Sequence, residues 1–301
     1  MSTLIRERLK GQSHDLGDGL MIRRVLPTPS GHAIGPFIFM DHFGPLTLPA
    51  TKPMDVRPHP HIGLATVTYL WQGRIEHKDA LGNTQVIEPG AVNWMTAGRG
   101  IVHSERTAAE DRGHAQSLHG LQLWVALPLE HERIAPSFEH TDASALPELS
   151  VDGASVRVIA GTAYGARSPV STLSKLFYVD ARMPKGKALH VPDEHVQRAA
   201  YLLEGDMRVD GESLQLGELM VFRPGAKIAL GASVDSHVVL LGGAPLDAPR
   251  YLWWNFVASS EAALEEARQA WREQRYAMVE GDAEFIPLPD DGRLTLRLEA
   301  G

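Results

Sequence analysis

The chain has 301 residues, of which 44% are hydrophobic and 22% charged, a composition typical of a folded globular protein that buries an extensive core. It contains no cysteine, which excludes disulfides, thiolate metal ligands and cysteine nucleophiles, so any metal must be held by histidine and carboxylate side chains. The net charge of −8, without a long basic run, argues against direct binding of nucleic acid.

The N-terminal segment, MSTLIRERLKGQSHD, lacks the apolar stretch of a secretion signal. No segment reaches the roughly 18 consecutive apolar residues that a membrane-spanning helix needs. We therefore expect a cytoplasmic protein without a membrane partner.

Short runs of β-branched and aromatic residues dominate the chain, for example LATVTYLWQG, AVNWMTAG, GLQLWVAL and KLFYVDARM. Turn residues recur about every 8–12 positions between them, which favours an all-β barrel or sandwich over alternating strands and helices. The segment ALGNTQ, residues 80–85, is expected to form the tip of a hairpin, because Gly82 and Asn83 suit the positive φ angles of tight turns.

An internal similarity indicates two copies of one module. ATVTYLWQGRIEH, residues 65–77, aligns with RAAYLLEGDMRVD, residues 198–210, and this places Tyr69 on Tyr201 and Gly73 on Gly205. Two β-barrel modules explain the length of the chain. We place the boundary in the Pro-, Ala- and acid-rich stretch 131–150 and divide the chain into residues 1–140 and 141–301.

Residues 259–279 are predicted to form a helix, because Leu264, Ala267 and Trp271 recur at helical spacing. Ser260 is available as the N-cap. We expect this helix to dock its apolar stripe on a barrel; the alternative is a helix that binds a partner.

Two pairs of metal-ligating residue types stand at strand ends. His59 and His61 flank Pro60 just before a β-type run, and His103 and Glu105 follow in GRGIVHSERT. Residues two apart in a strand point to the same side, so neighbouring strands carrying the two pairs could bring four donors to one ion.

The donor set limits the metal. Three imidazoles and one carboxylate suit Fe(II), Mn, Co, Ni, Cu or Zn, whereas calcium and magnesium sites are built from oxygen ligands. Open positions beside these ligands would make the metal reactive. A polar strand start is the alternative explanation for each pair.

The segments HPHIGLATVTYL, GNTQVIEPGAVNWMTAGRGIVHSERT and LQLWVALP, with FMDHFGP upstream, resemble the pirin family of the cupin superfamily. The resemblance is strongest over residues 37–128 and extends over nearly the whole chain. It implies an all-β fold of two cupin (jelly-roll-like) β-barrels face to face, with a short C-terminal helix added. The family's metal ligands fall on His59, His61, His103 and Glu105, in the N-terminal barrel only.

The second module lacks a comparable histidine pair. Ile228 stands near the place where a metal-binding cupin carries histidine, and His190, His195 and His237 form no pair two residues apart. We therefore expect a C-terminal barrel without metal.

One departure from the family bears on mechanism. Many pirins have Glu at the position of Ala65, so Glu105 would have to serve as metal ligand and also as proton acceptor. Asp41 and His42 in FMDHFGP offer a second acid–base pair, although an Asp that stabilises a turn beside a packed His is the preferred interpretation.

The resemblance implies a dioxygenase that uses O₂ to cleave quercetin or a similar enolisable aromatic compound, with iron as the expected metal. The alternative is a metal-dependent regulatory protein that binds a protein partner, as a transcriptional cofactor or a modulator of a metabolic enzyme. A third candidate is a zinc or nickel enzyme with another substrate.

Overall fold

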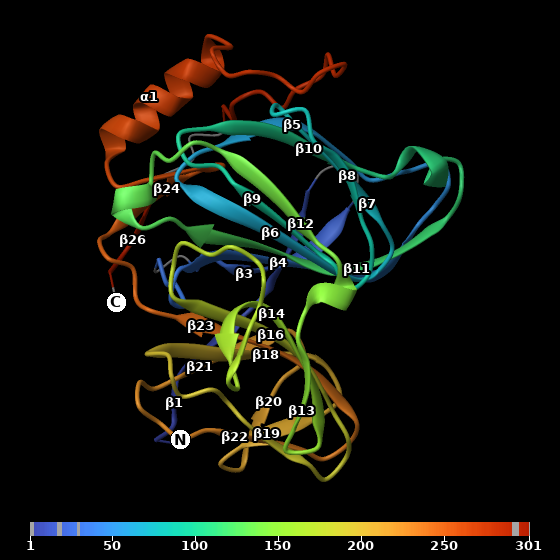
Figure 1. Cartoon of the computed structure of the whole chain (residues 1–301), viewed down its shortest axis with the longest axis vertical. Coiled ribbons are helices and arrows are strands. Elements are labelled where there is room, and N and C mark those ends of the chain that lie inside the picture. Colours follow the sequence, from blue (N-terminus) through green and yellow to red (C-terminus); the bar gives the residue numbers. More distant parts are fainter. Residues whose placement is uncertain (1–2, 17–19, 29–30, 291–294, 301) are drawn as a thin grey trace.

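The computed structural model describes residues 3–16, 20–28, 31–290 and 295–300. Strands build two barrels, one above the other in Figure 1, and α1 (Glu261–Arg272) is the one α-helix of the described residues. The predicted all-β fold of two barrels with a short C-terminal helix is confirmed. No helix in the described part of the chain is long and apolar enough to cross a membrane.

The first barrel consists of two sheets. The larger has the strand order β12-β9-β6-β11-β4-β3-β2, and the smaller has the order β5-β10-β7-β8. Their bounds are β2 Gln12–Asp15, β3 Met21–Leu26, β4 Phe37–Leu48, β5 Asp55–His61, β6 Leu64–Gln72, β7 Ile75–Asp79, β8 Thr84–Ile87, β9 Val92–Thr96, β10 Ile101–Arg106, β11 Gln116–Ala126 and β12 Ser137–Thr141. The hairpin predicted at residues 80–85 is confirmed, because β7 pairs with β8 around it.

The second barrel repeats this plan. One sheet has the order β1-β21-β18-β23-β16-β14-β13 with β15 on β14, and the other has the order β17-β22-β19-β20. Their bounds are β1 Ile5–Lys10, β13 Glu148–Val151, β14 Ala154–Ala163, β15 Ala166–Arg167, β16 Leu176–Met183, β17 Ala188–His190, β18 Gln197–Glu204, β19 Met207–Val209, β20 Glu212–Leu214, β21 Glu218–Phe222, β22 Ala229–Ala232 and β23 Ser236–Gly243.

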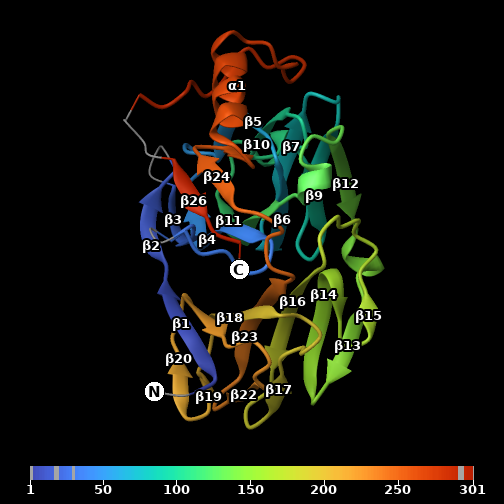
Figure 2. The ribbon, with the colours of Figure 1, turned by 90° about the vertical axis from the view of Figure 1, so that its left-hand side faces the viewer.

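The two ends of the chain cross between the barrels. Strand β1 pairs with β21 of the second barrel. The sheet β25-β24-β26 (β24 Arg250–Trp253, β25 Phe256–Ala258, β26 Leu296–Leu298) lies with α1 against the first barrel, as Figure 2 shows. The domain boundary near residue 140 stays a prediction. The two end segments do not follow it, because β1 packs on the second barrel and the C-terminal sheet with α1 packs on the first.

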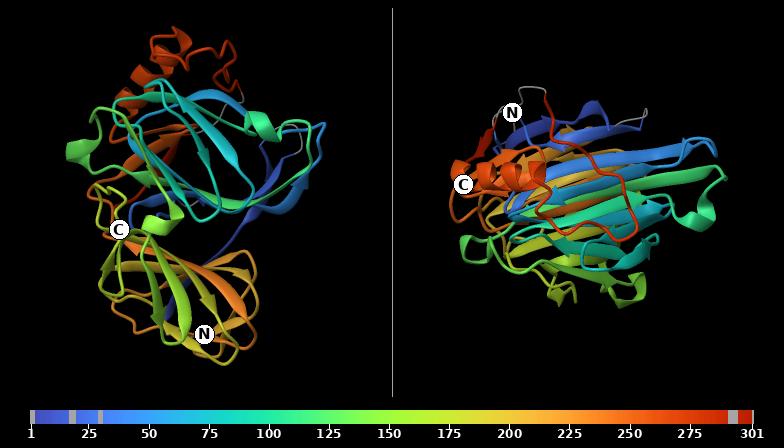
Figure 3. Two further views of the ribbon diagram at one scale, coloured as in Figure 1. Left: turned by 45° about the vertical axis from the view of Figure 1, so that its right-hand side comes forward. Right: turned by 90° about the horizontal axis from the view of Figure 1, so that it is seen from above.

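Strand β6 shows why the barrels pack face to face. Its odd-numbered residues Val67 and Tyr69 enter the apolar core shared by the two barrels, whereas Thr68 points to the interior of the first barrel. This two-residue period is the geometry of a strand buried on both faces. Two further views show the first barrel, blue to green, lying against the second, yellow to orange (Figure 3).

The internal repeat is visible in the shared core. Tyr69 of β6 and Tyr201 of β18 are both buried there. Gly73 and Gly205, which follow these strands, both have positive φ angles of 83° and 94°. The aligned positions thus have the same structural role in both barrels.

The interior of the second barrel is filled by apolar side chains, including Phe177, Leu189 and Ile228. The three histidines of this half make separate contacts: His190 with Asp152, His195 with the carbonyl of Thr162, and His237 with Asp180.

Gly63 links β5 to β6 at a close approach of backbone. Its φ is +68°, and a Cβ there would lie 2.0 Å from the carbonyl oxygen of Val257. Glycine is therefore required where the first barrel contacts β25.

The predicted helix of residues 259–279 is shorter in the structure. Ser260 is the N-cap, as expected, and accepts a hydrogen bond from the N–H of Ala263. The helix ends at Arg272 because Gln274 adopts a positive φ of 54°, and helical spacing in the sequence does not reveal this turn. Leu264, Ala267 and Trp271 are buried, so the predicted docking face is confirmed.

Candidate metal centre

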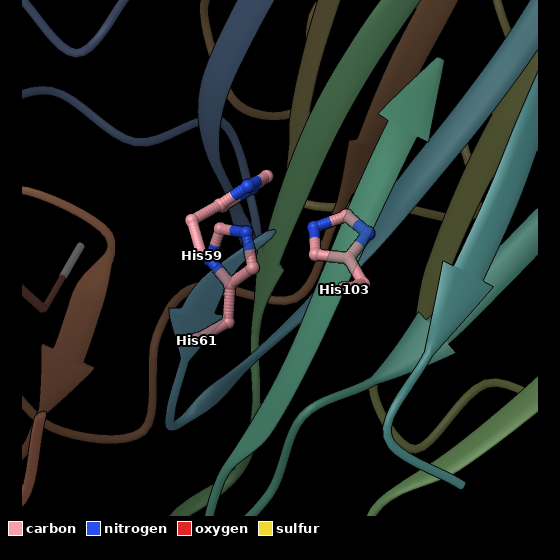
Figure 4. Close-up of side chains that lie close together, drawn as sticks. All are labelled: His59, His61 and His103. Atoms are coloured by element: carbon pink, nitrogen blue, oxygen red, sulfur yellow. The ribbon is translucent and has the colours of Figure 1, made fainter. Parts of the chain in front are cut away.

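Three predicted ligands converge inside the first barrel. β5 and β10 are antiparallel neighbours, and His103 lies directly opposite His59 in their register. The ring centroids are 5.0 Å apart for His59 and His61, 4.4 Å for His59 and His103, and 5.0 Å for His61 and His103. Figure 4 shows the ring of His103 across from the other two rings. One potential ligand atom from each ring lies within 4.8 Å of the other two.

Hydrogen bonds at Nδ1 indicate which ring nitrogens are free. Nδ1 of His59 donates to the carbonyl oxygen of Arg57 at 2.9 Å, and Nδ1 of His61 donates to that of Asn255 at 3.1 Å. A carbonyl only accepts, so both rings carry their proton on Nδ1 and present Nε2 as a lone pair. Nε2 of His103 is buried without a hydrogen-bond partner among the described residues.

Burial keeps the three rings neutral. It lowers the pKa of His59 to about 4 and the pKa values of His61 and His103 well below their ordinary value. A metal binds the neutral form of imidazole, so protons compete little for this site.

Glu105 lies in the same cavity but outside the three-histidine group. The pairing of β10 with β5 shifts register between His103 and Glu105, so the second pair does not continue the regular alternation. The carboxylate accepts a hydrogen bond from Oγ1 of Thr68 at 3.1 Å, and burial raises the pKa of Glu105. Glu105 as a fourth ligand stays a prediction.

The histidines border a cavity of about 340 Å³ with an aromatic wall. Phe39 and Trp124 stack at 3.9 Å, and the ring of Trp124 meets that of His61 edge-on at 5.1 Å. Arg24 lies over Phe39 and holds Asp41 with two hydrogen bonds of 2.8 and 2.7 Å. This wall can bind a planar aromatic molecule beside the histidines.

Asp41 and His42 do not form a pair. Asp41 lies in β4 against Arg24, not in a turn, whereas Nδ1 of His42 contacts the Tyr201 hydroxyl at 2.9 Å on the side of the second barrel. Neighbouring residues of a strand point to opposite faces, which explains the separation.

Sequence reasoning did not find the aromatic wall or the carbonyl of Asn255. The alternation in LQLWVAL does place Gln122 and Trp124 on one face of β11, which is a signal for the wall. The carbonyl of Asn255 is a backbone group 194 residues from His61, and no residue type marks it.

The donor set fits a first-row transition metal. Three neutral imidazoles with free Nε2 atoms, one of them buried without a partner, are the ligands such an ion needs, and the adjoining cavity leaves coordination positions open.

Fold and site together define a two-barrel cupin protein with a histidine cluster in its first barrel. Residues 19–125 match the family model of pirin, and residues 178–277 match that of the pirin C-terminal cupin domain. A pirin-like protein of Caulobacter vibrioides is 46% identical over 280 residues, which cover 92% of this chain and 96% of the relative. The chain belongs to the pirin family.

Two solved structures of quercetin 2,3-dioxygenase from Acinetobacter baumannii share the whole fold. One is 35% identical with a TM-score of 0.84 and covers 95% of this chain and 96% of its own. The other is 29% identical with a TM-score of 0.82 and covers 91% of this chain and 98% of its own.

Proposed function

We propose that the protein is a mononuclear metal dioxygenase acting on a flavonol such as quercetin or on a similar enolisable aromatic compound. The observation that carries this proposal is the cluster of His59, His61 and His103 at the end of a cavity walled by Phe39 and Trp124. Similarity to the quercetin 2,3-dioxygenase structures of A. baumannii supports it.

The protein groups would bind and orient the substrate. Phe39 and Trp124 line the cavity with aromatic surface against which an aromatic ring can pack, and Trp124 meets His61 edge-on. A substrate packed against this wall would lie beside His61. The apolar part of the lining, which includes Phe39, Phe43 and Trp124, would exclude water and strengthen electrostatic interactions with the substrate.

Glu105 is proposed as the proton acceptor. Its carboxylate lies in the cavity, and burial raises its pKa, which makes it a stronger base than an exposed glutamate. It would take the proton of an acidic hydroxyl group of the substrate, and Thr68 would hold the carboxylate in place.

A metal held by the three histidines, and by Glu105 as the fourth proposed ligand, would supply Lewis acidity and bring substrate and O₂ together. Iron is the expected occupant, with zinc, manganese, cobalt, nickel and copper as alternatives that the donor set also accommodates.

The test combines metal content with turnover. The purified protein is analysed for bound metals, and quercetin absorbance is followed with and without O₂. We expect O₂-dependent loss of quercetin that disappears in His61→Ala and in Glu105→Gln. His190→Ala is the matched control, because His190 lies exposed on the second barrel and should leave turnover unchanged.

Full occupancy by metal without turnover of any compound in a phenolic panel would contradict the proposed dioxygenase function and favour the alternative, a regulatory binding protein. Stoichiometric zinc that cannot be exchanged for an active metal would also count against dioxygenase chemistry. Unchanged turnover in Glu105→Gln would remove the proposed role of that residue alone.

A further inference from the structure

A second pair of buried residues stands behind the histidine cluster. His77 and Asp79 lie two residues apart on β7, which pairs with β10 on the side away from β5. Asp79 is opposite His103 in the register, and His77 is opposite Glu105. Both side chains are almost fully buried.

These residues form a hydrogen-bonded series that ends at His103. Oδ2 of Asp79 lies 3.1 Å from Nε2 of His77, and Nδ1 of His77 lies 3.4 Å from Nδ1 of His103. In its other contacts Asp79 also accepts hydrogen bonds, from the backbone N–H groups of Leu81 and Asn83 and from the side-chain amide of Asn83.

The donor and acceptor in each of these hydrogen bonds follow from the chemistry of the groups. An ionised carboxylate only accepts, so Nε2 of His77 carries a proton, and in the neutral ring Nδ1 of His77 is then the acceptor. The proton between the two rings therefore belongs to Nδ1 of His103. This leaves Nε2 of His103 as a lone pair, and that atom is buried with no partner among the described residues.

His77 is also fixed by packing. Phe138 of β12 stacks on its ring at 4.3 Å and an interplanar angle of 15°, and the ring of His103 lies 5.2 Å away. By contrast, His59 and His61 are oriented by backbone carbonyls. His103 is the one member of the cluster whose Nδ1 depends on another side chain.

We propose that His77 and Asp79 are positioning residues that fix the tautomer and orientation of His103 and thereby raise the affinity of the site for a divalent transition metal. The inference rests on the proposed metal site and adds to it two residues that lie outside the three-histidine group. A carboxylate or carbonyl behind a metal-binding histidine typically contributes about 10- to 100-fold in affinity.

The test uses two substitutions at one position. His77→Phe keeps a ring against Phe138 but removes both nitrogens, whereas His77→Asn places an amide oxygen where Nδ1 of His77 lies. We expect the affinity for Co²⁺, measured by titration calorimetry, to fall about 10- to 100-fold in His77→Phe and to be largely restored in His77→Asn. Phe138→Leu, which removes the stack and keeps both nitrogens, is the packing control.

A second measurement needs no metal. Nitrogen-15 NMR of the histidine rings in the metal-free protein should show His103 protonated at Nδ1 in the wild type, and a mixture of tautomers in His77→Phe. Wild-type affinity and an unchanged tautomer in a folded His77→Phe variant would overturn the proposal, as would a wild-type His103 protonated at Nε2. Absence of quercetin turnover with intact Co²⁺ binding would contradict the proposed function and leave this proposal standing.

Discussion

Among the described residues, Thr68 is the one whose side chain donates a hydrogen bond to Glu105, the proposed base. Its Oγ1 lies 3.1 Å from Oε1 of Glu105 and 2.8 Å from Oε1 of Gln122. One hydroxyl hydrogen serves only one acceptor at a time, so the buried carboxylate and the amide share this donor. A buried acceptor that loses its donor keeps its desolvation cost, which makes Thr68 a sensitive position.

We expect Thr68→Val to lower the free energy of unfolding by about 1–3 kcal/mol in urea at neutral pH, because the substitution keeps the shape and removes the donor. Metal affinity should fall as well, since Glu105 is no longer held. Thr68→Ser is the matched control: it loses a methyl group, worth about 1 kcal/mol, and should keep metal affinity near the wild-type value. Equal metal affinity in the valine and serine variants would show that the hydroxyl does not position Glu105.

At the scale of elements, α1 supports the site from outside. It packs on β24 and β25, and Asn255 between these strands supplies the carbonyl that orients His61. Nε1 of Trp271 donates to the carbonyl of Ile286 at 3.0 Å, which ties the segment after the helix to the same face. The helix is thus coupled to the proposed metal ligand His61 through the backbone carbonyl of Asn255.

Leu264→Ala should lower the free energy of unfolding by about 2–5 kcal/mol, because Leu264 is buried beneath α1 and its removal leaves a cavity. Glu265→Ala on the exposed face of the same turn should change it by less than about 0.5 kcal/mol. Denaturant unfolding of both variants checks the difference. A similar loss in both would indicate that helix formation, and not docking, provides the stability.

The elements that could be predicted are those with local signals. The hairpin at residues 80–85 and the docking face of α1 depend on turn residues and on spacing within a few residues. The pairing of β1 with β21 joins residues more than 200 positions apart, and an exposed sheet edge accepts any strand of suitable length. His59, His61 and His103 were predictable because strand geometry places i and i+2 on one face, whereas the register shift before Glu105 has no sequence signal.

At the scale of the molecule, Arg8 of the N-terminal strand holds the second barrel through two ion pairs, one with the buried Glu218 and one, at 3.2 Å, with the more exposed Glu212. Nη1 of Arg8 lies 2.8 Å from Oε2 of Glu218, whose side chain is 2% exposed. The same nitrogen donates to the carbonyl of Ser213 at 2.7 Å. A buried carboxylate without its partner is strongly unfavourable. The Arg8–Glu218 pair therefore favours the pairing of β1 with β21 over other positions of this strand.

We expect Arg8→Met to lower the free energy of unfolding by about 1–3 kcal/mol, less than for a fully buried pair because Arg8 remains partly exposed to solvent. Arg6→Met, an identical change at an exposed position of the same strand, should have an effect below about 0.5 kcal/mol. Adding Glu218→Gln to Arg8→Met should recover part of the loss in urea unfolding. No recovery would mean that the unpaired charge is not the cause.

The junction of the two barrels should make the protein sensitive to acid. Burial, with smaller contributions from the nearby His119, Arg23 and His237, lowers the pKa of His42 to about 3. His42 contacts the Tyr201 hydroxyl at 2.9 Å and Nε2 of His119 at 3.0 Å, so it joins the barrels as a neutral ring.

In the unfolded chain His42 titrates near its ordinary pKa of about 6.5, so the unfolded state gains a proton first as the pH falls. The contribution of His42 to the free energy of unfolding is therefore complete above about pH 6.5, declines as the pH falls, and is lost below about pH 3, with a total on the order of 5 kcal/mol. His42→Gln removes this titration and keeps a donor toward His119, so the plot of unfolding free energy against pH should be shallower between pH 6.5 and 4 than in the wild type. The urea series uses the metal-free protein, and the three histidines of the proposed metal site, which are not in contact with His42, contribute equally to both curves. Parallel curves would show that His42 is already protonated at the junction, and that the two barrels meet across a charged ring.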